Sequence, residues 1–126
     1  MAGIVYDTGA LLAAERRDVR FLAMHAEFLR AGVHPVVPVV VLAQAWRGGP
    51  QDGISRLLKG CQVRADDERT GRTAGVVCGM AGSSDVVDAL VVTTAALLGA
   101  VVVTSDPDDI GRLSDALGGA LELVTV

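Results

Sequence analysis

The sequence predicts an α/β fold of three layers, in which helices cover both faces of a mostly parallel central sheet. Short apolar, β-branched runs alternate along the chain with stretches whose apolar residues recur at helical spacing, and the connections are short. The run at residues 101–103 is continuous and apolar, as in a strand buried on both faces. Hydrophobic residues make up 51% of the chain but aromatic residues only 3%, which suits helices packed closely on a sheet.

The first half of the chain contains two strand signals and four helical ones. An apolar run at residues 3–6 predicts the first strand, and a helix is expected to begin near Ala10. Apolar residues at helical spacing over 21–29 predict a second helix that ends at Gly32. Two prolines flank a short extended piece at 36–37. Helices at 41–47 and 51–60 follow, separated by a Gly-Gly-Pro stop.

The second half continues the alternation. A minor strand is expected at 61–64 and a helix at 67–80, whose glycines recur every fourth residue and would let another helix approach closely. A helix at 87–98 starts from a cap at Asp85 or Ser84 and stops at Gly99. The strand at 101–104, a helix entered through Asp106-Pro107, and a last strand at 121–126 complete the order.

Length and composition limit the classes of protein that fit. A chain of 126 residues buries roughly two-thirds of its unfolded surface, so residues 1–126 are expected to form a single domain. No apolar run approaches the ~18 residues of a membrane span and no leader is visible, so we expect a cytoplasmic protein without a membrane anchor. The spacing of Cys61 and Cys78 favours buried free thiols over a disulfide or a zinc site.

Three acids stand where a helix begins. Asp7 follows the first strand and Asp106 the strand at 101–104, and the carboxyl ends of parallel strands meet at the edge where α/β proteins build their sites. Asp85 precedes the helix at 87–98. Because Asp is also among the best N-cap residues, stabilising a helix start by about 1 kcal/mol, capping is an alternative explanation for each of the three.

Capping does not explain the excess of negative charge. Asp88 lies one turn after Asp85 on the same helix face, among apolar neighbours, and two more acids follow Asp106. If Asp7, Asp88 and Asp106 converge, their repulsion requires a cation or protons. Mg²⁺ or Mn²⁺ suits such a site, because hard cations bind carboxylate oxygens and keep several waters. An open site of this kind activates water for attack on a phosphodiester.

Other kinds of catalytic site find little support. The chain has no Gly-rich loop followed by Lys-Ser or Lys-Thr, no GxGxxG after the first strand, and no nucleophile elbow around a serine. His25 falls on an apolar helical stripe and His34 precedes a proline, so we expect both to be structural.

Three motifs, taken in order, resemble the PIN domain. They are an early strand ending in Asp7-Thr8, a helix entered through Asp88-Ala89-Leu90-Val91-Val92-Thr93-Thr94-Ala95, and a strand ending in Thr104-Ser105-Asp106. The size and the Asp-Pro-Asp-Asp after the strand look most like VapC-type toxins of bacterial toxin-antitoxin pairs. The resemblance implies a magnesium- or manganese-dependent endoribonuclease with four acids lining its pocket.

The acids carry over residue by residue. Asp7 matches the first acid of the family, Asp88 the third and Asp106 the fourth, and these three are the expected metal ligands, with Asp109 as an outer addition. The second acid is usually a Glu, and Gln44 stands at its position. A Gln amide accepts a hydrogen bond from metal-bound water, but it brings no charge and is no general base.

Two other functions remain open. Gln44 favours a degenerate PIN domain that binds RNA or a protein partner without cutting. A receiver-like phosphoacceptor domain also gathers acids around magnesium, but it expects a late lysine, and the only lysine, Lys59, is in the wrong place.

Partners follow from charge and hydropathy. The mean hydropathy of +0.46 predicts apolar surface buried in a second chain, so we expect a homodimer and a groove for an antitoxin. The net charge of −4 argues against indiscriminate binding to nucleic acid, so an RNA substrate would have to meet local cations. The candidate cations are Arg16, Arg17, Arg20, Arg47, Arg56 and Lys59.

Overall fold

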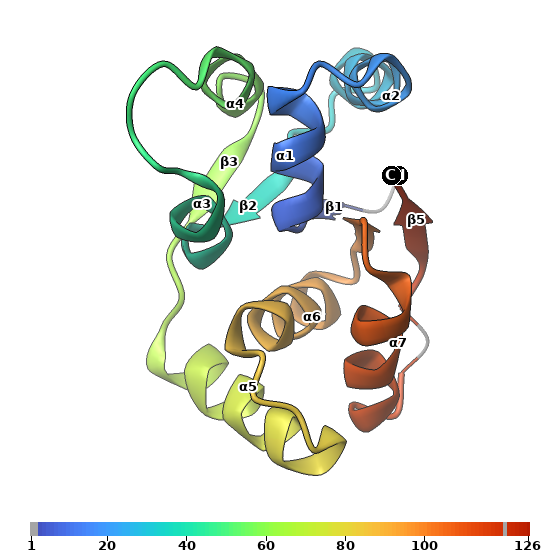
Figure 1. The fold of residues 1–126 in the computed structure, drawn as a ribbon. Helices are drawn as coiled ribbons and strands as arrows, with labels where there is room; N and C mark the ends of the chain where they lie inside the picture. Colours follow the sequence, from blue (N-terminus) through green and yellow to red (C-terminus); the bar gives the residue numbers. More distant parts are fainter. Residues whose placement is uncertain (1–2, 120) are drawn as a thin grey trace.

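A five-stranded sheet forms the centre of the computed structural model, which describes residues 3–119 and 121–126 (Figure 1). The strands lie in the order β3-β2-β1-β4-β5, and every adjacent pair is parallel. Their bounds are β1 Ile4–Tyr6, β2 Val36–Pro38, β3 Gln62–Arg64, β4 Val101–Thr104 and β5 Leu123–Thr125. The predicted parallel sheet is confirmed.

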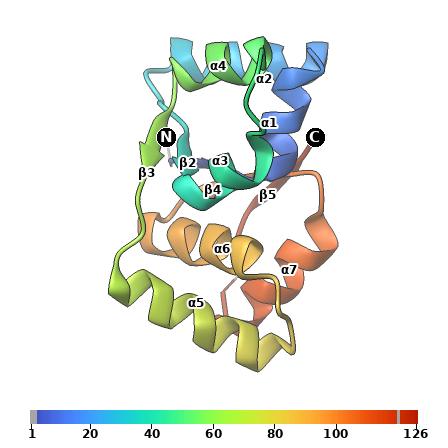
Figure 2. The same ribbon diagram turned by 60° about the vertical axis from the view of Figure 1, so that its left-hand side comes forward.

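Helices cover both faces of this sheet (Figures 1 and 2). Helices α1, α2 and α4 lie on one side, and α5, α6 and α7 lie on the other. Helix α3 follows β2 and contacts both α1 and α6. The bounds are α1 Thr8–Glu15, α2 Val19–Arg30, α3 Val39–Ala45, α4 Asp52–Leu58, α5 Glu68–Ala81, α6 Val86–Leu98 and α7 Pro107–Ala116. The three-layer α/β/α prediction is therefore confirmed.

The two central strands, β1 and β4, position the candidate site. Tyr6 pairs with Val103, so both strands end at the same edge of the sheet. The next residue, Asp7, donates its backbone N–H to the Val103 carbonyl at 3.1 Å. Asp7 and Asp106 therefore leave the sheet side by side, as their positions after strands predict.

Helix α3 differs from its predicted bounds. It begins two residues earlier than the expected 41–47, and it ends at Ala45, where Trp46 turns to an extended backbone. The side chain of Gln51 explains the early stop: its amide donates to the Ala45 carbonyl at 3.1 Å, and its carbonyl accepts the Arg47 N–H at 2.7 Å. These bonds satisfy groups that a longer helix would pair internally.

The prediction that the α5 glycines pack closely against another helix is wrong within this chain. Gly71, Gly75 and Gly79 are exposed, and a Cβ at any of them would have no atom within 4 Å. The buried face of α5, which includes Ala74 and Val77, is the one that packs inside the molecule. A spacing of four marks one helix face but not which face is covered.

Both cysteines are free, as predicted, with Cys78 buried and Cys61 partly buried. No single helix in the described part of the chain is long and apolar enough to cross a membrane. Helices α5 and α6 pass that test only as a pair, and the chain bends by 115° between them.

Candidate functional site

Three carboxylates gather where α6 and α7 begin. One oxygen each from Asp88, Asp106 and Asp109 lies within 4.8 Å of the other two, and we call these residues the acidic cluster. Asp88 comes from the first turn of α6, Asp106 precedes α7, and Asp109 lies in its first turn. Two of the three are metal ligands expected from the sequence.

Asp85 and Asp106 also act as helix N-caps. Asp85 accepts the Asp88 N–H at 3.0 Å at the start of α6, and Asp106 accepts the Asp109 N–H at 3.5 Å at the start of α7. Neither Asp88 nor Asp109 is an N-cap. The acids that local helix geometry does not require are thus the ones that complete the cluster.

Asp7 is placed differently from the cluster. It is only 3% exposed and caps α1 by accepting the Ala10 N–H at 3.1 Å. Burial raises the pKa of Asp7, while hydrogen bonds, chiefly from the Thr104 side chain, lower it. It is not one of the three carboxylates within 4.8 Å, but its charge reaches Asp88.

Asp88 experiences the crowding of negative charge most strongly. Burial, followed by the charge and hydrogen bond of Asp85 and the charges of Asp7 and Asp106, raises the pKa of Asp88 to about 7. Without a bound cation this carboxyl holds a proton through a pH range where an ordinary Asp is ionised. Carboxylate oxygens within 4.8 Å of one another, with Arg112 as the one cation paired to them among the described residues, fit a hard divalent cation.

Asp109 also pairs with the side chain of Arg112. A hydrogen bond shared with Asp109 raises the pKa of Asp106, while that bond and the Arg112 guanidinium lower the pKa of Asp109. A cavity of about 120 Å³ opens here, lined by Asp85, Asp88, Asp109, Arg112, Leu113 and residues 81–83. Sequence reasoning did not single out Arg112, although its position three residues after Asp109 is a helical pairing signal.

Gln44 contacts the residue that follows Asp7. Its side-chain oxygen accepts a hydrogen bond from the Thr8 hydroxyl, 36 positions earlier in the chain. The residue is exposed and lies outside the acidic cluster. Helix α3 therefore brings Gln44 to the amino end of α1, beside the residue that follows Asp7.

Gly9 permits the close approach of α1 to the loop after β4. A Cβ at Gly9 would lie 2.0 Å from the Ser105 Oγ and 2.5 Å from the Ser105 Cβ. Sequence reasoning missed this role, because Gly9 precedes the helix expected from Ala10 and looks there like an ordinary connecting residue. The absent side chain lets Asp7 and Asp106 lie at the same edge.

We expect Gly9→Ala to destabilise the fold by about 1–3 kcal/mol, because the new methyl group forces Ser105 and its backbone to move. Gly75→Ala is the matched control, since its Cβ meets open space and alanine favours a helix by up to about 1 kcal/mol. Chemical denaturation of both variants measures the difference. Equal stability would show that the loop after β4 yields without cost.

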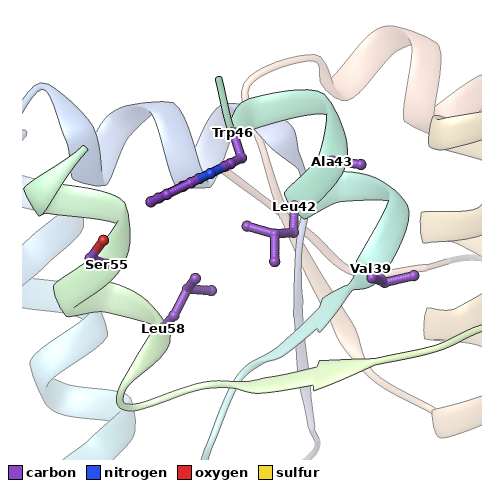
Figure 3. A pocket seen from close by; sticks show the side chains of 6 residues that line it. All are labelled: Val39, Leu42, Ala43, Trp46, Ser55 and Leu58. Carbon is purple, nitrogen blue, oxygen red and sulfur yellow. The ribbon is translucent and has the colours of Figure 1, made fainter. Parts of the chain in front are cut away.

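A second feature is apolar and lies between α3 and α4 (Figure 3). Its volume is about 380 Å³, and Figure 3 shows Trp46, Leu42 and Leu58 around the same space. Trp46 is 38% exposed and is the only tryptophan of the chain. We call this pocket, lined by Val39, Leu42, Ala43, Trp46, Ser55 and Leu58, the apolar groove.

No protein-family model matches the sequence, and no curated protein matches it. Solved structures do match. VapBC2 from Rickettsia felis, bound to a promoter DNA fragment, includes a chain with a TM-score of 0.72 at 15% identity, covering 98% of both chains. DNA-bound VapBC from Salmonella typhimurium gives 0.69 at 14% identity, covering 99% of this chain and 98% of the other.

FitAB bound to a DNA fragment gives a TM-score of 0.67 at 14% identity, covering 97% of this chain and 94% of the other. Such low identities establish architecture and not chemistry. The likeness nevertheless runs along nearly the full chain in each case. The protein therefore has the three-layer PIN-like fold of the VapBC structures.

Proposed function

We propose that the protein is a metal-dependent endoribonuclease, the toxin of a toxin-antitoxin pair acting in the cytoplasm. The acidic cluster carries the proposal, because the fold alone does not specify chemistry. Three carboxylates within 4.8 Å of one another, with Asp7 and Asp85 adding charge, form the set of hard oxygen donors that Mg²⁺ or Mn²⁺ binds.

The residues divide into holding and supporting roles. Asp88, Asp106 and Asp109 would hold the cation, and buried Asp7 adds negative charge behind Asp88. A bound divalent cation supplies a water of lowered pKa and offsets the charge that develops on a phosphodiester oxygen. Arg112, the ion-pair partner of Asp109, lines the same cavity and would contact a phosphate oxygen of RNA.

A non-catalytic PIN-like domain is the second candidate, and Gln44 is the observation that favours it. The amide brings no charge, and Thr8 already occupies its oxygen. Asp109 argues for activity. Its carboxylate gives the acidic cluster a third negative charge, although position 44 carries none.

The test of activity is cleavage of an end-labelled structured RNA by protein stripped of metal. We expect cleavage in Mg²⁺ or Mn²⁺ and none in chelator. RNA that is bound but left intact under every metal condition would favour the non-catalytic alternative. Cleavage at equal rates with chelator would reject both candidates.

We expect metal affinity to fall about tenfold for each pH unit below 7, because the cation must displace the proton held by Asp88. The raised pKa has the opposite effect on metal-free stability: the folded state holds a proton that the unfolded chain releases near pH 4. Stability is therefore lost as the pH rises from about 4 to about 7.

Calorimetric Mn²⁺ titrations between pH 5.5 and 8, with melting curves in chelator at the same values, measure both effects. Asp88→Asn is the control, since it removes the titrating group. A pH-independent affinity in the unmodified protein would contradict the assignment of Asp88 to the metal site.

We propose that the antitoxin occupies the apolar groove and that the toxin is a homodimer. The similar solved structures are VapBC complexes bound to DNA. An antitoxin segment with apolar side chains suits a groove lined by Leu42, Trp46 and Leu58. An Arg or Lys of that segment would compete with metal for the acidic cluster. Exposed Val76 and Met80, at 61% and 67%, give the dimer an apolar surface on α5.

Leu42→Asp is expected to abolish capture of the proposed antitoxin, since it places a charge in the groove. Trp46 reports binding, because burial of the only tryptophan shifts its fluorescence to shorter wavelength. Val63→Asp, at an exposed position outside the groove, is the control. Size exclusion with light scattering on the same samples gives the oligomeric state. Undiminished capture by Leu42→Asp would place the antitoxin elsewhere.

A further inference from the structure

A third pocket lies at the opposite end of α1 from Asp7. It is formed where the end of α1 meets α2 and α4, and its volume is about 450 Å³. This falls within the range of about 300–1,000 Å³ typical of small-ligand sites. We call it the basic pocket, because the charged residues that line it are Arg17, Arg56 and Lys59.

The charge of this pocket is unbalanced. No carboxylate lines it, and none of its three cations forms an ion pair with a described residue. The acids beside Arg17 in the chain have other partners: Asp18 accepts the Phe21 N–H at 2.9 Å and pairs with Arg16 at 3.9 Å. Glu15 accepts the Ile54 N–H at 3.3 Å at the start of α4. Three uncompensated cations in a chain of net charge −4 indicate an anionic ligand.

Arg17 has an unfavourable backbone conformation. Its φ of 58° makes it the one non-glycine residue at positive φ in the described part of the chain. It follows α1 at a position where helices commonly use glycine, and a larger residue there costs about 1–2 kcal/mol. A residue kept under strain at a pocket is a signal of function.

His25 adds a neutral donor to the pocket wall. Its Nδ1 and the buried Tyr6 hydroxyl lie 2.7 Å apart, and burial lowers the pKa of the ring. When the hydroxyl donates this hydrogen bond, the proton of the neutral ring is on Nε2. A Cβ at Gly60 would lie 3.2 Å from this Nε2 and 2.9 Å from Leu29 Cδ1, so glycine leaves that wall open.

The remaining wall is apolar, with Leu22, Leu29 and Leu57 beside the cations. A largely apolar pocket with three cations in its lining suits a ligand that joins an anion to a flat, weakly polar body. We propose that the basic pocket binds a phosphorylated nucleoside, with its phosphate against Arg17, Arg56 and Lys59 and its base against the leucines.

Such a nucleotide is either free or part of an RNA strand, and the second case rests on the proposed function. The eight residues of α1 span about 12 Å. At about 3.4 Å per stacked nucleotide, a strand of about four nucleotides covers that distance. The basic pocket would then bind a nucleotide of the RNA strand about four positions from the one at the acidic cluster.

The experiment measures binding by calorimetry in chelator, where the acidic cluster holds no metal. The probes are adenosine 5′-monophosphate, adenosine, inorganic phosphate, a short single-stranded RNA and polyglutamate. Arg17→Gly is the sharpest variant, because it removes the cation and relieves the strained backbone, so loss of binding cannot be attributed to unfolding. Arg56→Gln is the second, and Arg69→Gln on α5 is a matched control outside the pocket.

We expect the monophosphate to bind more tightly than adenosine or phosphate alone. Arg17→Gly and Arg56→Gln should each weaken its binding about tenfold, the effect of one charge-assisted hydrogen bond, while Arg69→Gln has none. If RNA occupies the pocket, each pocket variant also lowers the slope of log affinity against log salt by about 0.7. An unchanged RNA slope with weakened monophosphate binding assigns the pocket to the free nucleotide.

Monophosphate affinity that is equal in Arg17→Gly, Arg56→Gln and the unmodified protein would overturn the inference. Equal binding of polyglutamate would also overturn it, by showing a general anion surface. RNA cleavage in metal with no binding at the basic pocket leaves the proposed nuclease standing without this inference. Monophosphate binding without RNA cleavage would support the basic pocket and reject the proposed nuclease.

Discussion

Replacing Asp88 with Asn is expected to reduce metal-dependent RNA cleavage by about 100-fold or more, because loss of even an outer-shell partner costs 10–100-fold. Asp88 is the residue on which the charges of Asp85, Asp7 and Asp106 converge. The same substitution should stabilise the metal-free protein at pH 8, since it removes a carboxylate that repulsion disfavours. At pH 4.5 the two proteins should melt together.

Asp115→Asn is the matched control for this experiment. It removes one negative charge from an exposed position of α7 that lies outside the acidic cluster. Cleavage rates in Mn²⁺ and melting curves in chelator, measured on both variants, separate catalysis from folding. A variant Asp88→Asn that is folded and fully active would remove this residue from the mechanism.

Gln44→Glu is expected to tighten Mn²⁺ binding about tenfold, or 1.4 kcal/mol, by adding a negative charge beside Thr8 and Asp7. Cleavage should increase in parallel if the charge at this position limits the reaction. Gln62→Glu on β3 adds the same charge far along the sheet and serves as control. No gain in affinity would mean that position 44 faces a different part of the surface from the metal.

Much of the site follows from local sequence signals. The apolar run before Thr104 and the Asp-Pro after it specify a buried strand entering a helix, and this alone places Asp106 at the sheet edge. The spacing of Asp85 and Asp88 likewise specifies one helix face. These features depend on residues a few positions apart, where the geometry of the chain is fixed.

The identity of the third carboxylate did not follow in the same way. Asp7 follows the strand next to the one that leads to Asp106, but its side chain turns toward its own helix and accepts the Ala10 N–H, whereas Asp109 lies in the cluster. That orientation depends on the packing of β1 against β4 and on the space left by Gly9. No local pattern encodes it.

The basic pocket shows the same limit. Arg17 and Arg56 are 39 positions apart and meet only because Gly53 lets α4 approach the end of α1, where a Cβ would lie 2.4 Å from the Ala14 carbonyl oxygen. Individually the two arginines are typical surface cations. The exposed glycine face of α5 is the converse case, in which a clear pattern misidentified the packed side.

The most direct test of the metal site is an anomalous difference map from crystals soaked in Mn²⁺. We predict the strongest peak between the carboxylates of Asp88, Asp106 and Asp109, and no peak there in crystals of Asp88→Asn. A map without a peak at the acidic cluster, at Mn²⁺ concentrations that support RNA cleavage, would contradict the account.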